Sequence, residues 1–201
     1  MNESFTRLAG WMAYANAVLS IAGFVTLVGF FINGGILGTV NDAISVLWAL
    51  TFVPLLLLLY QLNRPVNQPL SLAANFAGIA AALGFALLQS LLVLGIVRFE
   101  QTFMAVVVLG ALIGLAVLMG GLMARGGQTL PSGLTWMFIA YGLGYALSAV
   151  GIWLGGQEHP LAASGYLIGA IAGPIWAIWL GRLLLNGARV TATGLDIGGS
   201  L

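Results

Sequence analysis

Six apolar stretches, separated by short connectors, constrain this chain more than any other feature. A helix needs about 20 consecutive apolar residues to cross the hydrocarbon core of a bilayer. The stretches that meet this length cover residues 8–32, 44–62, 69–97, 103–124, 134–155 and 161–185. Gly, Pro, Asn and Ser fill the connectors, none of which is long enough to separate two domains. The sequence therefore predicts an all-α fold, a bundle of six transmembrane helices in a single domain over residues 1–201.

The composition points to lipid as the solvent. Hydrophobic residues make up 61% of the chain and charged residues 5%, whereas a soluble domain has roughly 25% charged residues to hydrate its surface. The net charge is +1, and binding a polyanion requires clustered Lys or Arg. The lipid bilayer is thus the expected partner, and nucleic acid is excluded.

The few charged residues alternate along the chain and predict its orientation. Arginines recur about every sixty residues, and acidic residues recur out of phase with them. The arginines are Arg7, Arg64, Arg125 and Arg182, and the acidic residues are Asp42, Glu100 and Glu158. Cytoplasmic loops of membrane proteins collect Lys and Arg, so we expect both termini in the cytoplasm. Arg98 falls on the predicted outer side.

Single residues predict several helix ends and the depth of several side chains in the membrane. Asn41-Asp42 is expected to cap the second helix, and Pro69 and Pro160 are expected near the starts of the third and sixth. Tryptophan and tyrosine prefer the depth of the lipid headgroups. On this basis we expect Trp48 and Trp176, with most other aromatic residues near the ends of the stretches, to anchor the protein at the two membrane surfaces.

The chain lacks most groups that carry catalysis. It has no cysteine, no lysine and one histidine, which excludes iron–sulfur clusters, thiolate zinc sites and lysine imines and leaves no pair of histidines for haem. Glu158-His159 is more simply interpreted as a solvated loop than as an acid/base pair or half a metal site. We therefore expect no catalytic residue, no metal site and no cofactor.

Stripes of small residues predict close packing between helices. Lipid offers no hydrophobic drive for helix association, so small residues that let backbones approach become important. Packing within the bundle is the favoured interpretation; a homo-oligomer or a larger membrane complex stays open as the alternative. The stripes contain Gly165, Gly169, Gly173, Ala177 and Gly181 in the sixth stretch, Ala74, Gly78 and Ala82 in the third, and Gly110 and Gly114 in the fourth.

Five other residues are candidates for lining a ligand site. Pro54 and Pro174 are expected to interrupt the second and sixth helices, since proline removes an N–H donor and frees a carbonyl. Tyr141, Tyr145 and Ser148 share one helix face at spacings of four and three residues. Tolerated kinks and interhelical hydrogen bonds are the simpler interpretation of these residues.

The second stretch and its exit resemble a bacterial six-helix membrane family of unknown function. The family pattern is a Leu-rich helix, then Tyr-x-Leu-x-Arg-Pro-Val, then Leu-x-Leu-x-Ala-Ala. The matching residues are Tyr60, Arg64, Pro65, Val66, Leu70, Leu72, Ala73 and Ala74. The resemblance implies a multi-pass protein of the bacterial cytoplasmic membrane, with no known activity to transfer.

Three functions are compatible with these patterns. The favoured hypothesis is a non-enzymatic accessory or assembly subunit that packs through its small-residue faces. The alternative is a transporter or channel for a small neutral or lipophilic molecule, built around the Pro54 and Pro174 interruptions and the tyrosine face. A lipid-acting enzyme ranks third, because Glu158-His159 or Arg98 and Glu100 would have to converge on a pocket.

Overall fold

The structure is a computed structural model, and it describes residues 2–186, 189–191 and 194–196. Within these residues the chain forms six long α-helices and one short antiparallel hairpin. The helices are α1 (Glu3–Asn33), α2 (Ile36–Asn63), α3 (Gln68–Val93), α4 (Phe99–Gly127), α5 (Ser132–Gly155) and α6 (Pro160–Leu185). The hairpin pairs β1 (Arg189–Thr191) with β2 (Gly194–Asp196), with Val190 opposite Leu195; the sequence did not predict these strands.

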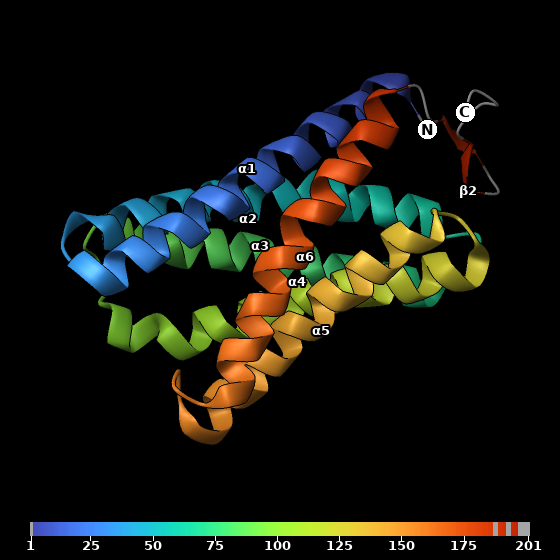
Figure 1. Cartoon of the computed structure of the whole chain (residues 1–201). Helices are drawn as coiled ribbons and strands as arrows, with labels where there is room; N and C mark the ends of the chain where they lie inside the picture. Colours follow the sequence, from blue (N-terminus) through green and yellow to red (C-terminus); the bar gives the residue numbers. More distant parts are fainter. Residues whose placement is uncertain (1, 187–188, 192–193, 197–201) are drawn as a thin grey trace.

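The six helices form a closed ring. Each helix packs against the next in the chain, α1 also packs against α6, and α2 contacts α4 across the interior. Successive helices run in opposite directions, so the α2–α3 and α4–α5 connections lie at the same end of the bundle as the N-terminus (Figure 1). We call this the arginine end, because Arg7, Arg64, Arg125 and Arg182 all lie near it in sequence. The α1–α2, α3–α4 and α5–α6 connections form the opposite end.

All six helices are long and apolar enough to span a membrane. Large apolar side chains are exposed along them, among them Phe31, Leu87 and Trp153. Exposed apolar surface on this scale would be unfavourable in water, whereas lipid tails solvate it well. The structure thus fits a multi-pass membrane protein.

The helix ends agree with the predicted capping except at α2. Asn67 and His159 cap α3 and α6 by accepting hydrogen bonds from backbone N–H groups. As expected, Pro69 is the second residue of α3 and Pro160 the first of α6. The expected start of α2 at Asn41-Asp42 is wrong, because α2 begins at Ile36, directly after Gly35. Both residues fit inside the helix: the Asn41 side chain accepts a hydrogen bond from the Thr26 hydroxyl of α1 at 3.1 Å.

Two further boundaries differ from expectation. The third stretch was expected to reach residue 97, but α3 ends at Val93, where Gly95 takes a left-handed conformation that only glycine adopts readily (φ 68°). The interruptions expected at Pro54 and Pro174 do not break the helices, since α2 and α6 remain α-helical through both residues. Neighbouring helices can support a helix around a missing hydrogen bond.

The core is closed towards the arginine end and looser towards the opposite end. Leu55, Leu59 and Leu62 of α2 are fully buried near the arginine end. In α1 the last buried residue is Ala17, and the remainder of the helix, to Asn33, has none. The first ten residues of α6 bury one narrow stripe, Ala162, Gly165 and Gly169, whereas its later turns bury a broader surface.

Candidate functional site

The glycine stripe of α6 packs against the polar face of α5, residue by residue. A Cβ atom added to Gly165 would collide with the backbone nitrogen of Ser148. At Gly169 it would lie 3.0 Å from the Tyr145 ring, and at Gly173 it would lie 3.2 Å from the Tyr141 ring. The two tyrosine rings therefore occupy space that larger α6 side chains would fill. The predicted packing stripe and the predicted ligand-lining face meet at one interface.

Tyr141 and Tyr145 belong to a cluster of aromatic rings that fills the middle of the helix ring. Their ring centroids lie 4.8 Å apart. Tyr145 stacks on Trp48 of α2 at 6.1 Å, and Tyr141 meets Trp176 of α6 edge-to-face at 5.8 Å. The remaining members, which we include in the name aromatic cluster, are Phe52, Phe85 and Phe138. The cluster connects α2, α3, α5 and α6.

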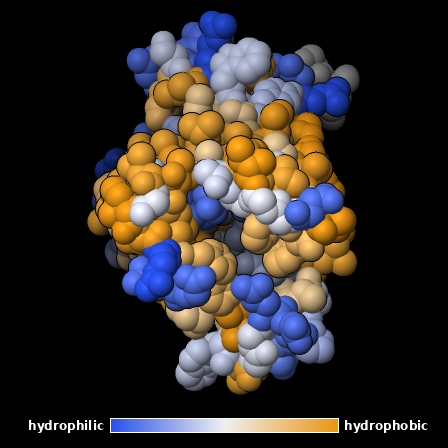
Figure 2. All heavy atoms as spheres, turned by 90° about the vertical axis from the view of Figure 1, so that its left-hand side faces the viewer, coloured by the Kyte–Doolittle hydropathy of each residue, from blue (hydrophilic) through white to orange (hydrophobic). Residues whose placement is uncertain are grey.

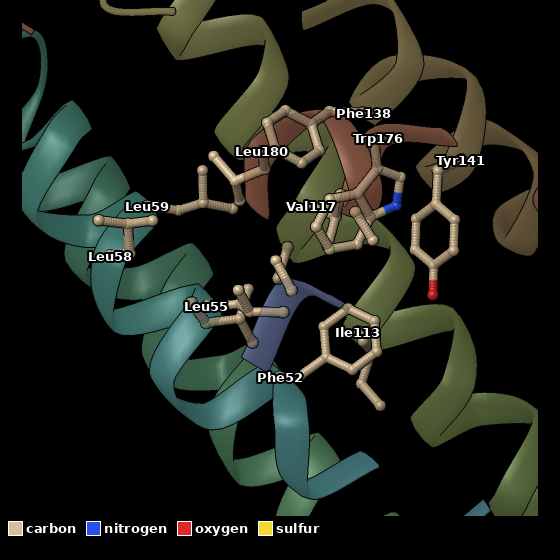
Figure 3. Close-up of a cluster of buried hydrophobic side chains, with 14 of the residues drawn as sticks. Phe52, Leu55, Leu58, Leu59, Ile113, Val117, Phe138, Tyr141, Trp176 and Leu180 are labelled. Atoms are coloured by element: carbon tan, nitrogen blue, oxygen red, sulfur yellow. The ribbon is translucent and has the colours of Figure 1, made fainter. Parts of the chain in front are cut away.

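The deeper part of this cluster is closed. Tyr141, Trp176, Phe52 and Phe138 are all essentially buried. Figure 3 shows that the Tyr141 hydroxyl points from the Phe138 end of the cluster towards the level of Ile113 and Phe52. In the same view, leucines of α2 and α6 lie on the side of the cluster away from Tyr141.

Several polar atoms in and around the cluster have no hydrogen-bond partner. A buried polar group without a partner costs about 1–3 kcal/mol, so such groups are rare unless they serve a purpose. Within the described residues, five such atoms belong to the cluster or to neighbouring turns: Tyr141 OH, Trp176 Nε1, Ser148 Oγ, Gln89 Oε1 and Asn16 Oδ1. The Tyr141 hydroxyl lies near that of Tyr145, and the Ser148 hydroxyl lies near that of Tyr166, but neither pair has the geometry of a well-formed hydrogen bond. The Asn16 amide nitrogen does have a partner, the Thr51 hydroxyl at 2.7 Å. The set offers both donors and acceptors to a bound molecule.

Tyr145 lies where the cluster meets open space. It is surrounded by Gly114 of α4, Gly169 of α6 and Trp48 of α2, yet it keeps partial exposure. Because these helices separate it from the outer surface of the bundle, this exposure opens towards the interior. Figure 2 views the end opposite the arginine end and shows a central hollow, with hydrophilic side chains beside it and apolar ones around it. The hollow lies at the end of the bundle where the core is looser.

The other small residues predicted to pack lie between helices of this chain. A Cβ atom on Gly78 would collide with Ala116 of α4, and one on Gly114 would meet Tyr145 of α5. A Cβ atom on Gly181 would lie 3.1 Å from the Gly10 carbonyl oxygen of α1. Ala82 and Ala177 are fully buried, Gly110 is buried, and Ala74 is partly buried.

The predicted ligand-lining prolines neighbour the aromatic cluster along their helices. Pro54 and Pro174 are both partly buried. Pro54 follows Phe52 by two residues and Pro174 precedes Trp176 by two, so each proline lies within one turn of an aromatic residue of the cluster.

Sequence reasoning assigned Trp48 and Trp176 to the membrane surfaces, but both are buried. Trp48 was wrongly placed because α2 starts earlier in the chain than expected. Trp48 is twelve residues after Ile36, or about 18 Å along a helix at 1.5 Å per residue. Trp176 precedes the end of α6 by nine residues, about 14 Å. Counting depth from the true start of α2 would have placed Trp48 in the interior. The end of α6 was predicted correctly at residue 185, so the same count already placed Trp176 well inside the helix.

The candidate acid/base residues have structural roles or lie at helix starts. The His159 side chain caps α6 by accepting a hydrogen bond from the Leu161 N–H at 3.2 Å, and Arg98 and Glu100 lie at the start of α4. Among the described residues, no three His, Asp or Glu side chains are grouped so that they could hold a metal ion.

Comparison with protein-family models, curated proteins and solved structures finds no match, so no family is identified. The resemblance at Tyr60–Ala74 stays an expectation. The geometry of the aromatic cluster is therefore the main evidence for function.

Proposed function

We propose that the protein is a membrane transporter or channel for a small uncharged molecule, which binds at the aromatic cluster beneath the hollow. The observation that carries this proposal is the group of unpartnered polar atoms around Tyr141, Ser148 and Gln89 in the middle of the helix ring. A bound molecule, or the water that precedes it, would supply the hydrogen bonds that these atoms lack. Binding sites commonly combine aromatic walls with a few such polar groups.

The chemistry of the interior favours an uncharged ligand. The buried polar residues are Thr, Asn, Ser and Gln, with no Arg, Asp or Glu among those the structure describes. An ion taken into such a site would lose its hydration without gaining an opposite charge, which is costly. Rings such as those of Trp48 and Tyr145 favour a molecule with an apolar face as well as hydrogen-bonding groups.

An accessory or assembly subunit, which the sequence favours, would need a different contact surface. The small-residue stripes on α3, α4 and α6 pack against helices of the same chain, so a partner would have to bind elsewhere. The interior site gives the transport proposal a specific location, and we therefore place it first.

The orientation belongs to the proposal as well. Four arginines at one end of the bundle support a cytoplasmic location for that end by the positive-inside rule. The hollow would then open to the outer side of a bacterial cytoplasmic membrane. This places the proposed binding site in an outward-facing state.

Thiol labelling of this cysteine-free chain tests the site directly. In proteoliposomes, we expect Tyr145→Cys to react with a charged, membrane-impermeant thiol reagent, because Tyr145 is partly exposed and the proposal puts it within reach of the hollow. Leu58→Cys is the matched control, since Leu58 is fully buried in the closed part of the core. Protection of Tyr145→Cys by a panel of small uncharged solutes would identify ligands.

A flux measurement tests the function. Osmotic swelling of proteoliposomes should be faster than that of protein-free vesicles for at least one uncharged solute of the panel. Tyr145→Cys treated with the thiol reagent should lose this excess rate, and Leu58→Cys treated in the same way should keep it. Swelling equal to that of protein-free vesicles for every solute, with Tyr145→Cys unreactive, would refute the proposal.

A further inference from the structure

A second pocket lies at the arginine end, away from the aromatic cluster. It has a volume of about 430 Å³ and is lined by Arg125, Gln128, Leu130 and Ser132, where α4 ends and α5 begins. Among the described residues that line it, there is one fixed positive charge and no carboxylate. The pocket therefore suits an anion better than a neutral or cationic group.

Two contacts hold the Arg125 side chain in place. Its guanidinium carbon lies 4.3 Å from the centroid of the Trp136 ring, a cation–π arrangement. Its Nη1 donates a hydrogen bond to the Ser132 hydroxyl at 3.2 Å. A guanidinium has five N–H donors, so most of them remain for a ligand. An arginine already fixed in position loses less conformational entropy when it binds an anion.

The start of α5 adds a second attraction for negative charge. Pro131, the residue that precedes α5, makes no side-chain capping hydrogen bond, and Ser132 is the first residue of the helix. The N–H groups of a first helical turn have no partner within the helix, and they favour an anion nearby. Ser132, the first residue of this turn, lines the pocket, so the start of α5 lies at its edge.

The surroundings of the pocket indicate where the anion comes from. Trp136 and Leu122 are both about half exposed, at 51% and 45%. Leu122 precedes Arg125 by three residues and so lies on the same side of α4, on the apolar surface. A pocket that contains arginine and adjoins apolar helix surface at a membrane boundary matches a lipid, whose phosphate lies next to its acyl chains.

We propose that this pocket binds the phosphate group of an anionic membrane lipid. Arg125 and the first turn of α5 would bind the phosphate, and Trp136 would fix the guanidinium and contact the glycerol region. This site is independent of the proposed transport function, because none of its residues belongs to the aromatic cluster.

Native mass spectrometry of the purified protein in a neutral detergent tests the proposal. The probes are phosphatidylglycerol, phosphatidylcholine and inorganic phosphate, each titrated separately. We expect the wild-type protein to prefer phosphatidylglycerol, and Arg125→Gln to bind it about tenfold more weakly because the charged hydrogen bonds are lost. Arg125→Lys should fall between the two, since lysine keeps the charge but loses the planar, ring-stacked geometry.

Arg64→Gln is the matched control, because Arg64 follows α2 at the same end of the bundle but does not line the pocket. Its affinity for phosphatidylglycerol should equal that of the wild type. Ser132→Ala gives a second, milder variant that removes the hydrogen bond to Arg125. Unchanged thermal unfolding in the absence of lipid would show that each variant is folded.

Three results would overturn the proposal. Equal weakening by Arg64→Gln and Arg125→Gln would mean that general surface charge attracts the lipid. Equal affinity for phosphatidylcholine would remove the preference for an anionic lipid. Inorganic phosphate binding as tightly as phosphatidylglycerol would identify a site for free anions instead of a lipid site.

Discussion

Gly144 and Gly165 let α5 and α6 approach until main-chain atoms touch. A Cβ atom on Gly144 would lie 2.8 Å from both the Gly165 carbonyl oxygen and the Gly169 nitrogen. Main-chain atoms cannot rotate away as a side chain can, so even one methyl group would push the two helices apart. The glycines, which have no side chain, thus set the spacing of this helix pair and leave room for the tyrosine rings.

Gly144→Ala should destabilise the protein by about 1–3 kcal/mol, as overpacking of a tight interface does. Gly126→Ala is the matched control, because a Cβ atom there would meet nothing within 4 Å. That change should be neutral or stabilising by up to about 1 kcal/mol, since alanine favours helix over glycine. Unfolding in mixed micelles with increasing denaturing detergent measures both. Equal stability of the two variants would contradict the described α5–α6 contact.

At the scale of elements, polar side chains connect helices where small residues do not. Asn63 at the end of α2 is fully buried. Its amide nitrogen donates to the Gly120 carbonyl of α4 at 3.0 Å, and its oxygen accepts from the Thr129 hydroxyl at 3.3 Å. One side chain therefore connects α2, α4 and the α4–α5 connection near the arginine end.

Asn63→Ala should lower the free energy of unfolding by about 1–3 kcal/mol, because it removes two buried hydrogen bonds and leaves the buried Thr129 hydroxyl without this acceptor. The control is Asn33→Ala at the end of α1, where the side chain is exposed and bonds only to the Gly29 carbonyl of its own helix. That variant should change stability by less than about 0.5 kcal/mol. The same detergent titration serves here, and a loss at Asn33 as large as that at Asn63 would count against the role assigned to Asn63.

The sequence predicted the elements better than it predicted the site. The positions of six apolar helices follow from length and hydropathy, and Pro69 and Pro160 predicted two helix starts correctly. The start of α2 was missed because Asn41 resembles a capping residue, whereas its actual partner, Thr26, lies on another helix. Trp48 and Trp176 were placed at the surface for the same reason: burial of an aromatic ring depends on neighbouring helices, which periodicity within one helix does not reveal.

For the whole molecule, the ring of helices gives the protein two different ends. The arginine end has a closed leucine-rich core, and the opposite end has the hollow and the looser packing. The orientation of these ends in the membrane decides which compartment the aromatic cluster faces. The absence of cysteine from the whole chain makes the orientation directly measurable.

Gln128→Cys and Gln157→Cys place one exposed thiol at each end. With the arginine end in the cytoplasm, an impermeant thiol reagent added to intact cells should label Gln157→Cys only. Both variants should be labelled after the membrane is permeabilised, which controls for expression and access. Labelling of Gln128→Cys alone in intact cells would show the opposite orientation.

The two halves of α6 have different neighbours, and this has a mechanical consequence. Its first turns pack closely against the α5 backbone at Gly144 and Ser148, and its last turns contact α1 at Gly10 as well as α5 through Trp176. Bending or twisting within α6 would therefore let the angle between α1 and α5 change while the close contact of its first turns is kept. Pro174 lies between the two contact regions, where the missing N–H lowers the resistance of the helix to bending. α6 would then act as a flexible coupling, and its stiffness at Pro174 would set how readily the mouth of the hollow widens or narrows.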